Sequence, residues 1–168
     1  MTRICLHRAA IAGLAALAIA AAVATPGFAQ GDALLGAWTF VSERSKFTPG
    51  PVPYKDLTLK FSATERGLRN DAEGVDADGR PISATYVIVP DGKYHPVTGV
   101  PEFDSSSYTR VGDKNTVYVR QKHGTTVVVG SRALTGGGKT LIFRQKSVDN
   151  LGIETGRALL VFNKQEPG

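Results

Sequence analysis

Residues 54–61 have the sequence YKDLTLKF, and this stretch decides the fold class. Leu57, Leu59 and Phe61 alternate with polar side chains, and a period of two is typical of a β-strand with one buried face. The same alternation returns at residues 82–88 and is most regular in the last third of the chain. Further strands are expected to be centred near Tyr108, Val119, Val128, Phe143 and Leu160. The sequence therefore predicts an all-β protein.

Turn signals separate these strands at short intervals. The signals are rich in glycine, aspartate and asparagine, and they occupy residues 76–79, 90–93, 112–115, 123–124, 136–139 and 149–152. Proline-rich residues 45–53 are expected to form an extended loop, because proline cannot donate a hydrogen bond inside a sheet. A single meander of this kind favours an antiparallel up-and-down barrel of about eight to ten strands that closes on itself.

The N-terminus has the features of a cleaved signal peptide. Arg3 and Arg8 precede an apolar run from Ile11 to Val23, which is shorter than the roughly 20 residues that span a bilayer. Small residues at Gly27 and Ala29 favour cleavage after Ala29. We therefore expect a signal peptide over residues 1–29 and one lipocalin-like domain over residues 30–168. The mature chain would be periplasmic or secreted from a bacterium, with no membrane span.

Composition excludes several classes of function for this mature chain. Cys5, the only cysteine, would leave with the signal peptide, so the mature chain has no disulfide and no cysteine chemistry. Loss of Arg3 and Arg8 lowers the net charge from +5 to +3, and no basic cluster predicts a nucleic-acid partner. No cofactor motif, catalytic constellation or metal-ligand spacing is present, and an enzyme is the less favoured interpretation.

Gly36-Ala37-Trp38 resembles the Gly-x-Trp opening of the lipocalin and fatty-acid-binding barrels. Longer segments resemble small exported bacterial lipocalin-like proteins of unassigned function, and they cover residues 45–51, 74–79, 91–99 and 161–165 in that order. The chain departs from this pattern at His95 and at Gly136–Gly138. The resemblance implies a barrel with Trp38 packed across its closed end, and it implies no catalytic residues.

Alternation also predicts which side chains face the barrel interior. Ten are expected to face inward: Trp38, Phe40, Leu57, Leu59, Phe61, Tyr86, Val119, Phe143, Leu160 and Phe162. Their neighbours are expected to face outward: Lys60, Thr85, Arg120, Arg144 and Val161. Truncation of Phe143 would then cost about 3 to 5 kcal/mol if the interior is filled around it, and less if Phe143 lines a cavity.

Arginines occur about once per strand in the second half of the chain. In fatty-acid-binding barrels, inward arginines hold a ligand carboxylate through two parallel hydrogen bonds. Arg110 is the best candidate here because it shares a face with Tyr108, whereas Arg132 and Arg157 lie on strands with apolar residues on both faces. The candidate ligand-lining residues are Tyr86, Tyr108, Arg110 and Phe143.

Two long loops are the segments that a barrel explains least, and the second contains a candidate site. Lys93, Tyr94, His95 and Asp104 lie in or next to this loop, at residues 91–104. Three hypotheses for the function follow. The first is a barrel that binds a small, largely apolar molecule in its interior. The second is a module with a filled core that binds protein or glycan through its loops. The third is an enzyme at the barrel mouth around Tyr94, His95 and Asp104.

Overall fold

The computed structural model of the protein describes residues 32–166, so the expected signal peptide lies outside the described residues. Eleven strands and two short 3-10 turns make up the described chain. Their bounds are β1 Gly36–Phe40, η1 Ser42–Arg44, β2 Lys46–Thr48, β3 Tyr54–Thr64, β4 Gly67–Asp76, β5 Pro81–Ile88, β6 Asp91–Pro96, β7 Ser105–Val111, β8 Asn115–Lys122, β9 Thr125–Thr135, η2 Gly136–Gly138, β10 Thr140–Val148 and β11 Glu154–Lys164. Within residues 32–166 no helix is long and apolar enough to cross a membrane.

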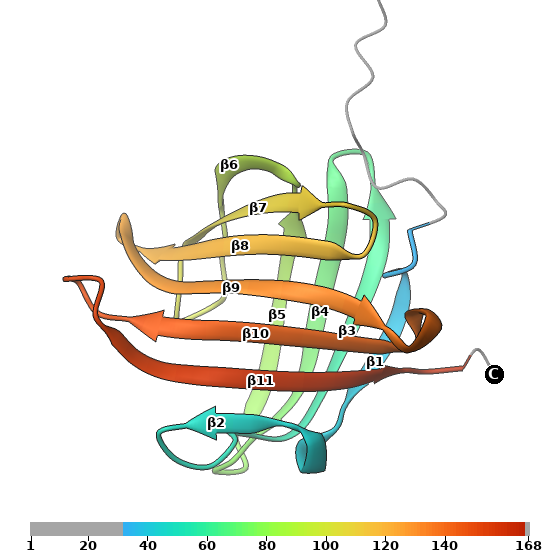
Figure 1. Ribbon diagram of the computed structural model, residues 1–168, viewed down its shortest axis with the longest axis horizontal. Coiled ribbons are helices and arrows are strands. Elements are labelled where there is room, and N and C mark those ends of the chain that lie inside the picture. The colour runs from blue at the N-terminus through green and yellow to red at the C-terminus, as the bar shows by residue number, and fades with distance from the viewer. Residues whose placement is uncertain (1–31, 167–168) are drawn as a thin grey trace, which may run out of the picture.

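The strands form one curled antiparallel sheet, as the sequence predicts. Ten strands follow the order β5-β4-β3-β1-β11-β10-β9-β8-β7-β6, and β2 pairs with β11 beside this path. In Figure 1 the layer β7–β11 lies in front of β1, β3, β4 and β5 and crosses them at a large angle. The end strands β5 and β6 are not hydrogen-bonded to each other. The sequence predicts a barrel that strand pairing closes, and the structure differs from this expectation between β5 and β6. The register of β6 shifts between Asp91 and Tyr94, which makes it a short and irregular edge.

The proline-rich segment after β1 contains the short strand β2, although its proline content predicts an extended loop there. Ser45 bridges the interruption between β1 and β2. Its buried hydroxyl donates to the carbonyl oxygen of Val41 at 2.8 Å and accepts the backbone N–H of Val161 at 3.0 Å. One side chain therefore replaces ladder hydrogen bonds where the chain turns outward, and β2 can rejoin β11 beyond it.

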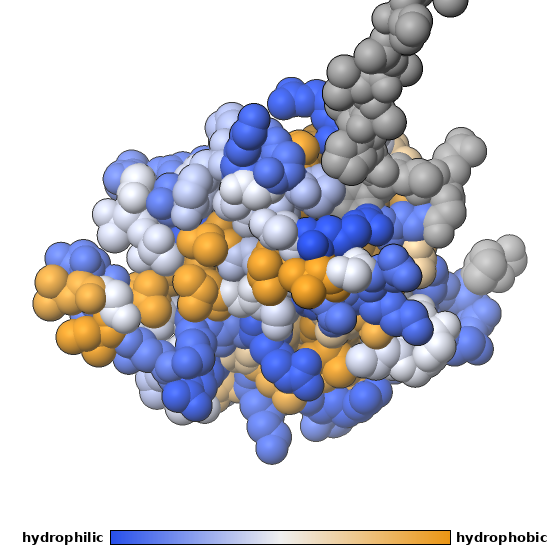
Figure 2. Space-filling model, turned by 45° about the horizontal axis from the view of Figure 1, so that its top comes forward, coloured by the Kyte–Doolittle hydropathy of each residue, from blue (hydrophilic) through white to orange (hydrophobic). Residues whose placement is uncertain are grey.

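The outer face of the front layer carries scattered apolar side chains between charged ones (Figure 2). Apolar side chains gather most clearly at the β10–β11 turn, which projects at the left of Figures 1 and 2. Leu151 and Ile153 in this turn are 78% and 60% exposed, the highest values among the large hydrophobic residues described. We call the end of the barrel that carries this turn the hairpin end.

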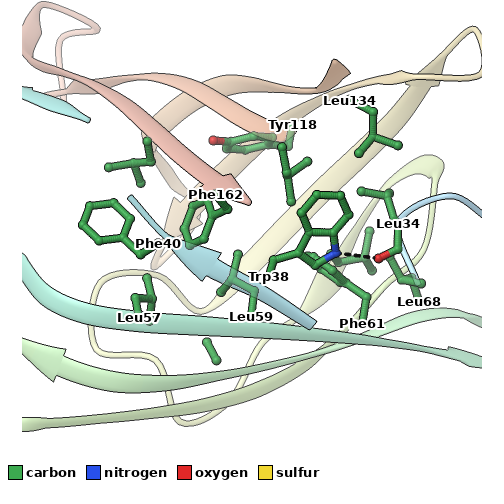
Figure 3. Close-up of a cluster of buried hydrophobic side chains, with 14 of the residues drawn as sticks. Leu34, Trp38, Phe40, Leu57, Leu59, Phe61, Leu68, Tyr118, Leu134 and Phe162 are labelled. Atoms are coloured by element: carbon green, nitrogen blue, oxygen red, sulfur yellow. Dashed lines mark hydrogen bonds between the residues drawn. The ribbon is translucent and has the colours of Figure 1, made fainter. Parts of the chain in front are cut away.

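The opposite end is filled by Trp38, and we call it the Trp38 end (Figure 3). Trp38 has no exposed surface, and its indole N–H donates to the carbonyl oxygen of Leu34 at 2.8 Å. Leu34 precedes β1 in a turn capped by Asp32, whose carboxylate accepts the Leu34 backbone N–H at 3.0 Å. The Lys164 ammonium lies 5.2 Å from the indole ring. The short turn before β1 thus covers the tryptophan and satisfies its one polar atom.

Aromatic rings continue the core across the middle of the barrel. Phe40, Phe162, Phe143, Tyr118 and Tyr108 form a chain whose successive ring centroids lie 5.5 to 6.5 Å apart. Three of the four contacts are edge-on and the Tyr108–Tyr118 contact is tilted, and such aromatic pairs add stability beyond the buried area. Because the rings come from β1, β7, β8, β10 and β11, they join both layers of the sheet.

The predicted register is correct on most strands. Of the ten side chains expected inside, all except Val119 belong to the core or pack against it. Lys60, Thr85 and Arg144 are exposed as expected. Val161 lies outside the core cluster yet is buried, because the segment from Val41 to Ser45 crosses the outer face of β11.

The predicted register of β8 is wrong. Tyr118 is buried and Arg120 faces the interior, whereas Val117 is 44% exposed and Val119 lies on the same outer face. The Tyr118 ring fits over Gly130 of β9, where an added Cβ would lie 2.6 Å from the ring. The large ring therefore occupies the space that the glycine leaves, and the β-branched valines take the outer face, which β-propensity permits.

Truncating Phe143 to alanine is expected to destabilise the protein by about 3 kcal/mol. Phe143 is only partly buried, but its ring packs between Phe162 at 5.6 Å and Tyr118 at 6.5 Å, so the truncation leaves a void between two aromatic rings. Urea unfolding followed by tryptophan fluorescence measures the change. A loss below about 1 kcal/mol would mean that Phe143 borders open space rather than a filled core.

Candidate functional site

Two arginines project into the barrel interior from neighbouring strands. Arg132 on β9 is 2% exposed, and Arg120 on β8 is partly exposed with a buried Nε. The Arg132 guanidinium lies 5.5 Å from the Phe61 ring, and its Nη2 donates a long hydrogen bond of 3.4 Å to the Thr116 hydroxyl. The Arg120 guanidinium lies 4.5 Å from the Phe103 ring and 4.9 Å from the Tyr118 ring. Neither arginine forms an ion pair with a carboxylate among the described residues.

Several polar atoms around these arginines are buried without a hydrogen-bond partner among residues 32–166. They are Asn70 Oδ1, Ser106 Oγ, Arg120 Nε, Arg132 Nε and Arg132 Nη1. Buried polar atoms in native proteins are almost always bonded to protein or to ordered water, so each exception requires an explanation. Three of the five are guanidinium N–H groups. The interior therefore contains unused donors that suit an anion.

Three tyrosine side chains interact with these two arginines. Both Arg120 and Arg132 interact electrostatically with Tyr86, Tyr108 and Tyr118, and Tyr108 is also hydrogen-bonded to Arg120. Burial raises the pKa of Tyr108 and of Tyr118 above the ordinary value of 10.0. The two phenols therefore stay neutral at physiological pH and can donate. We call these five residues the interior polar cluster.

Raised tyrosine pKa values predict a loss of stability in alkali. Burial raises the pKa of Tyr54 as well as those of Tyr108 and Tyr118. Because the folded values lie above the unfolded ones, this contribution to stability is complete below about pH 10 and is lost as the pH rises through the folded values. We expect the free energy of unfolding to fall above about pH 10, and three tyrosines to ionise late in an absorbance titration at about 295 nm. Ionisation of all five tyrosines near pH 10 would contradict this expectation.

The gap between β5 and β6 leads toward the interior polar cluster. A pocket of about 230 Å³ lies in this gap, and we call it the gap pocket. It is lined by Arg66, Thr85, Tyr86, Val87, Val89, His95, Pro96 and Thr98. Tyr86 belongs both to this lining and to the interior polar cluster, and its ring packs edge-on against Phe103 at 5.9 Å. The Tyr86–Phe103 pair therefore separates the pocket from the buried arginines.

A second concavity lies on the outside of the barrel. It has a volume of about 520 Å³ and is lined by residues of β2, β9, β10 and β11, and we call it the outer groove. Lys46, Arg144, Lys146 and Arg157 contribute its charges. Glu154 pairs with Lys146 at 3.1 Å and with Arg157.

The structure locates the predicted ligand-lining residues in two places. Tyr86, Tyr108 and Phe143 face the interior. Arg110 lies at the end of β7 with 40% of its side chain exposed, and its Nη2 pairs with Asp32 Oδ2 at 2.6 Å. Their role in lining a ligand stays a prediction. The two deeply placed arginines are Arg120, which alternation placed outside, and Arg132, which it left open.

The candidate loop residues do not converge on one site. His95 Nε2 lies 2.9 Å from Asp91 Oδ1, whereas Asp104 accepts the backbone N–H of His123 at 2.8 Å. Lys93 and Tyr94 are exposed on β6. Asp91 and Asp104 therefore contact two different histidines, His95 and His123. Within residues 32–166 no group of three or more metal-ligating side chains lies together.

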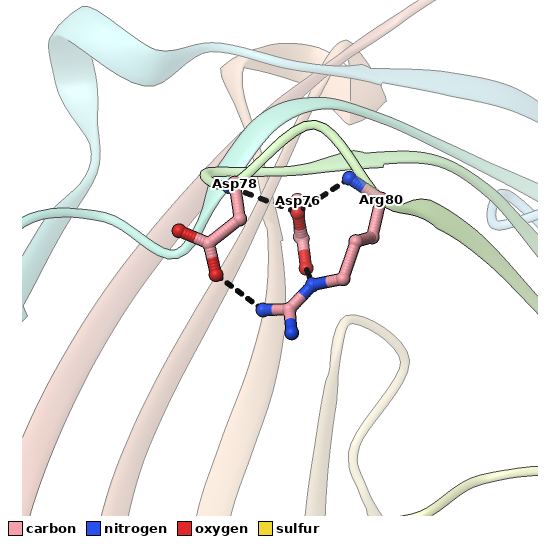
Figure 4. Close-up of polar contacts among 3 residues, drawn as sticks. All are labelled: Asp76, Asp78 and Arg80. Carbon is pink, nitrogen blue, oxygen red and sulfur yellow. Dashed lines mark hydrogen bonds and ion pairs between the residues drawn. The ribbon is translucent and has the colours of Figure 1, made fainter.

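The paired carboxylates of the β4–β5 turn have a structural role (Figure 4). Asp76 accepts the backbone N–H groups of Asp78 at 2.9 Å and Arg80 at 2.8 Å, and the Arg80 guanidinium contacts both carboxylates. The backbone hydrogen bond from Arg80 is the largest of the effects that lower the pKa of Asp76. These acids therefore hold a turn together.

No family model and no curated protein matches this chain. The similar solved structures are β-barrels of the fatty-acid-binding and lipocalin type. A protein of unknown function from the DUF3598 family of Nostoc punctiforme is 17% identical with a TM-score of 0.53, over 79% of this chain and 48% of that protein. At that identity the likeness shows the fold alone.

Two further structures have lower TM-scores. A single-site mutant of the fluorescent protein UnaG is 14% identical with a TM-score of 0.47, over 77% of this chain and 94% of UnaG. The zebrafish ileal bile acid-binding protein, complexed with cholic acid, is 10% identical with a TM-score of 0.45, over 79% of this chain and 99% of that protein.

Proposed function

We propose that this chain binds a small molecule with an acidic group and an apolar body inside its barrel. The observation that carries the proposal is the pair Arg120 and Arg132, which face the interior with buried N–H groups that have no hydrogen-bond partner and which form no ion pair among residues 32–166. A buried charge without a partner costs several kcal/mol, and a bound anion would remove much of that cost. Two guanidinium groups beside neutral phenols form a site for a carboxylate or a similar anion.

The gap pocket supports a route for such a ligand. Tyr86 lines the pocket and interacts with both interior arginines, so a ligand in the pocket lies one side chain away from these arginines. The pocket also contains Val87, Val89 and Pro96, which suit an apolar body. A volume of about 230 Å³ favours a short molecule over a long-chain lipid.

A matched pair of ligands tests the proposal. Octanoate and octanol have the same alkyl chain, but only octanoate has a charge. We expect octanoate to bind at least tenfold more tightly in isothermal titration calorimetry, because only its carboxylate uses the guanidinium donors. In Arg120→Met this preference should disappear while octanol binding is retained.

Arg144→Met is the control for that variant. Arg144 lies on β10 and is exposed on the outer face, so its removal changes the net charge equally without changing the interior. We expect it to retain the preference for octanoate. Equal affinity of the unmodified protein for the two ligands, or no binding of either, would contradict the proposal.

One observation favours a second function, a module with a filled core that binds a partner on its surface. The aromatic chain from Phe40 to Tyr108 occupies the middle of the barrel, and the larger concavity lies outside it. The partner would be a protein or glycan that contacts the loops. The calorimetry distinguishes the two functions, because a filled module binds neither octanoate nor octanol.

We further propose that the chain is exported to the periplasm or medium of a bacterium as a lipocalin-like barrel. The charged residues Arg3 and Arg8, the apolar run from Ile11 to Val23 and the small residue at Ala29 support this proposal. N-terminal sequencing of the protein from its producing cells tests it. We expect a mature chain that begins at Gln30, and a retained Met1 would contradict export by cleavage.

A further inference from the structure

The β10–β11 turn presents two apolar side chains on a rigid support. Asp149 Oδ1 accepts the backbone N–H groups of Leu151 at 2.9 Å and Ile153 at 2.8 Å, and the Asp149 N–H donates to the Ile153 carbonyl oxygen at 2.9 Å. A fourth hydrogen bond runs from the Gly152 N–H to the Asp149 carbonyl oxygen at 3.0 Å, so the backbone of the turn is fixed while its two large side chains contact water. Exposed apolar patches rimmed by polar residues mark protein or membrane interaction sites.

The outer groove next to this turn carries an excess of positive charge. Lys146 and Arg157 lie directly opposite each other in the β10–β11 ladder, and like charges in that position destabilise a sheet. Glu154 lies between them. Arg144 and Lys46 border the same groove, and no ion pair of theirs is described within residues 32–166. Four cations thus line the groove, and the one carboxylate in the described chain that pairs with any of them is Glu154.

We propose that the hairpin end docks on an anionic lipid bilayer, with Leu151 and Ile153 entering the interface and the cations of the outer groove contacting lipid phosphates. An interfacial protein contact of this kind combines a shallow apolar insertion with Lys and Arg beside it. The Figure 2 view shows the apolar turn projecting beyond the body of the barrel, where a flat surface can reach it. The proposal is independent of what the interior binds.

Charge complementarity favours a bilayer over other occupants. A soluble acidic partner would use the four cations but would leave the exposed apolar turn without a role. A neutral bilayer would take up Leu151 and Ile153 but would provide no anion for Lys46 and Arg144, which form no ion pair within residues 32–166. An anionic bilayer satisfies both features at once.

Vesicle sedimentation tests the proposal with protein purified from its producing cells. Vesicles contain phosphatidylcholine alone or phosphatidylcholine and phosphatidylglycerol in equal parts. We expect at least tenfold stronger binding to the anionic vesicles. The double variant Leu151→Ser/Ile153→Ser and the double variant Lys46→Gln/Arg144→Gln should each weaken this binding about tenfold.

Matched controls use positions far from the hairpin end. Val111→Ser/Val117→Ser removes exposed apolar side chains of β7 and β8, and Lys60→Gln/Lys114→Gln removes exposed cations elsewhere. Both should bind anionic vesicles as the unmodified protein does. All variants share one N-terminus, so any contribution from it cancels in the comparison.

Three results would overturn the proposal. The first is equal binding to the two vesicle types. The second is unchanged binding after the Leu151→Ser/Ile153→Ser substitutions, which would mean that the apolar turn does not enter the interface. The third is an equal loss in the control variants, which would indicate a non-specific attraction. Far-UV circular dichroism verifies that each surface variant remains folded.

Discussion

Trp38→Ala is expected to destabilise the folded chain by about 4 kcal/mol. The indole has no exposed surface and fills the Trp38 end, so its removal leaves a large void. The substitution also leaves the Leu34 carbonyl oxygen without the indole N–H that it accepts at 2.8 Å. Trp38 is the only tryptophan, so urea unfolding must be followed by far-UV circular dichroism.

Trp38→Phe separates the two contributions. Phenylalanine retains most of the buried ring but loses the hydrogen bond to Leu34, so we expect a loss of about 1 to 2 kcal/mol. A loss below about 1.5 kcal/mol for Trp38→Ala would mean that the Trp38 end collapses around the void or is not filled as described.

Arg132→Met is expected to stabilise the ligand-free protein, by about 1 to 3 kcal/mol. The guanidinium is buried with two unpaired nitrogens, and methionine has a similar length without a charge to desolvate. The same substitution should weaken octanoate binding at least tenfold if Arg132 contributes to the anion site. Urea unfolding and calorimetry on one preparation measure both effects.

An Arg132→Met variant that is more stable but binds octanoate more weakly would show that Arg132 serves ligand binding rather than the stability of the fold. A structural arginine would be held by partners in the fold, so its removal would destabilise the protein by several kcal/mol. Arg144→Met, on the exposed face of β10, should change stability by less than about 0.5 kcal/mol. Destabilisation by Arg132→Met would therefore contradict the anion site.

The sequence predicts much of the fold because most strands bury only one face. On β3 the alternation of Leu57, Leu59 and Phe61 with polar residues leaves one possible register. On β8 both faces carry apolar residues, so periodicity does not determine the register, and the prediction was wrong there. The decisive contact is the Tyr118 ring over Gly130, which joins two strands and is not visible in either one alone.

The candidate site was harder to predict than the fold. Tyr86 and Tyr108 were placed on the inner face by alternation with their neighbours. The direction of the Arg120 side chain depends on the register of β8. Because that register was predicted wrongly, Arg120 was placed on the outer face. The gap between β5 and β6 depends on which strands fail to pair, and single-strand patterns contain no such information.

The most direct test of the central claim is the ionisation of a ligand carboxyl group inside the barrel. Octanoate labelled with carbon-13 at its carboxyl carbon is bound to the protein and followed by NMR as the pH is lowered. Two guanidinium groups next to the carboxylate would hold its pKa well below that of the free acid. We expect a bound resonance that does not shift over the pH range in which free octanoate becomes protonated. A bound resonance that titrates together with the free acid would contradict it.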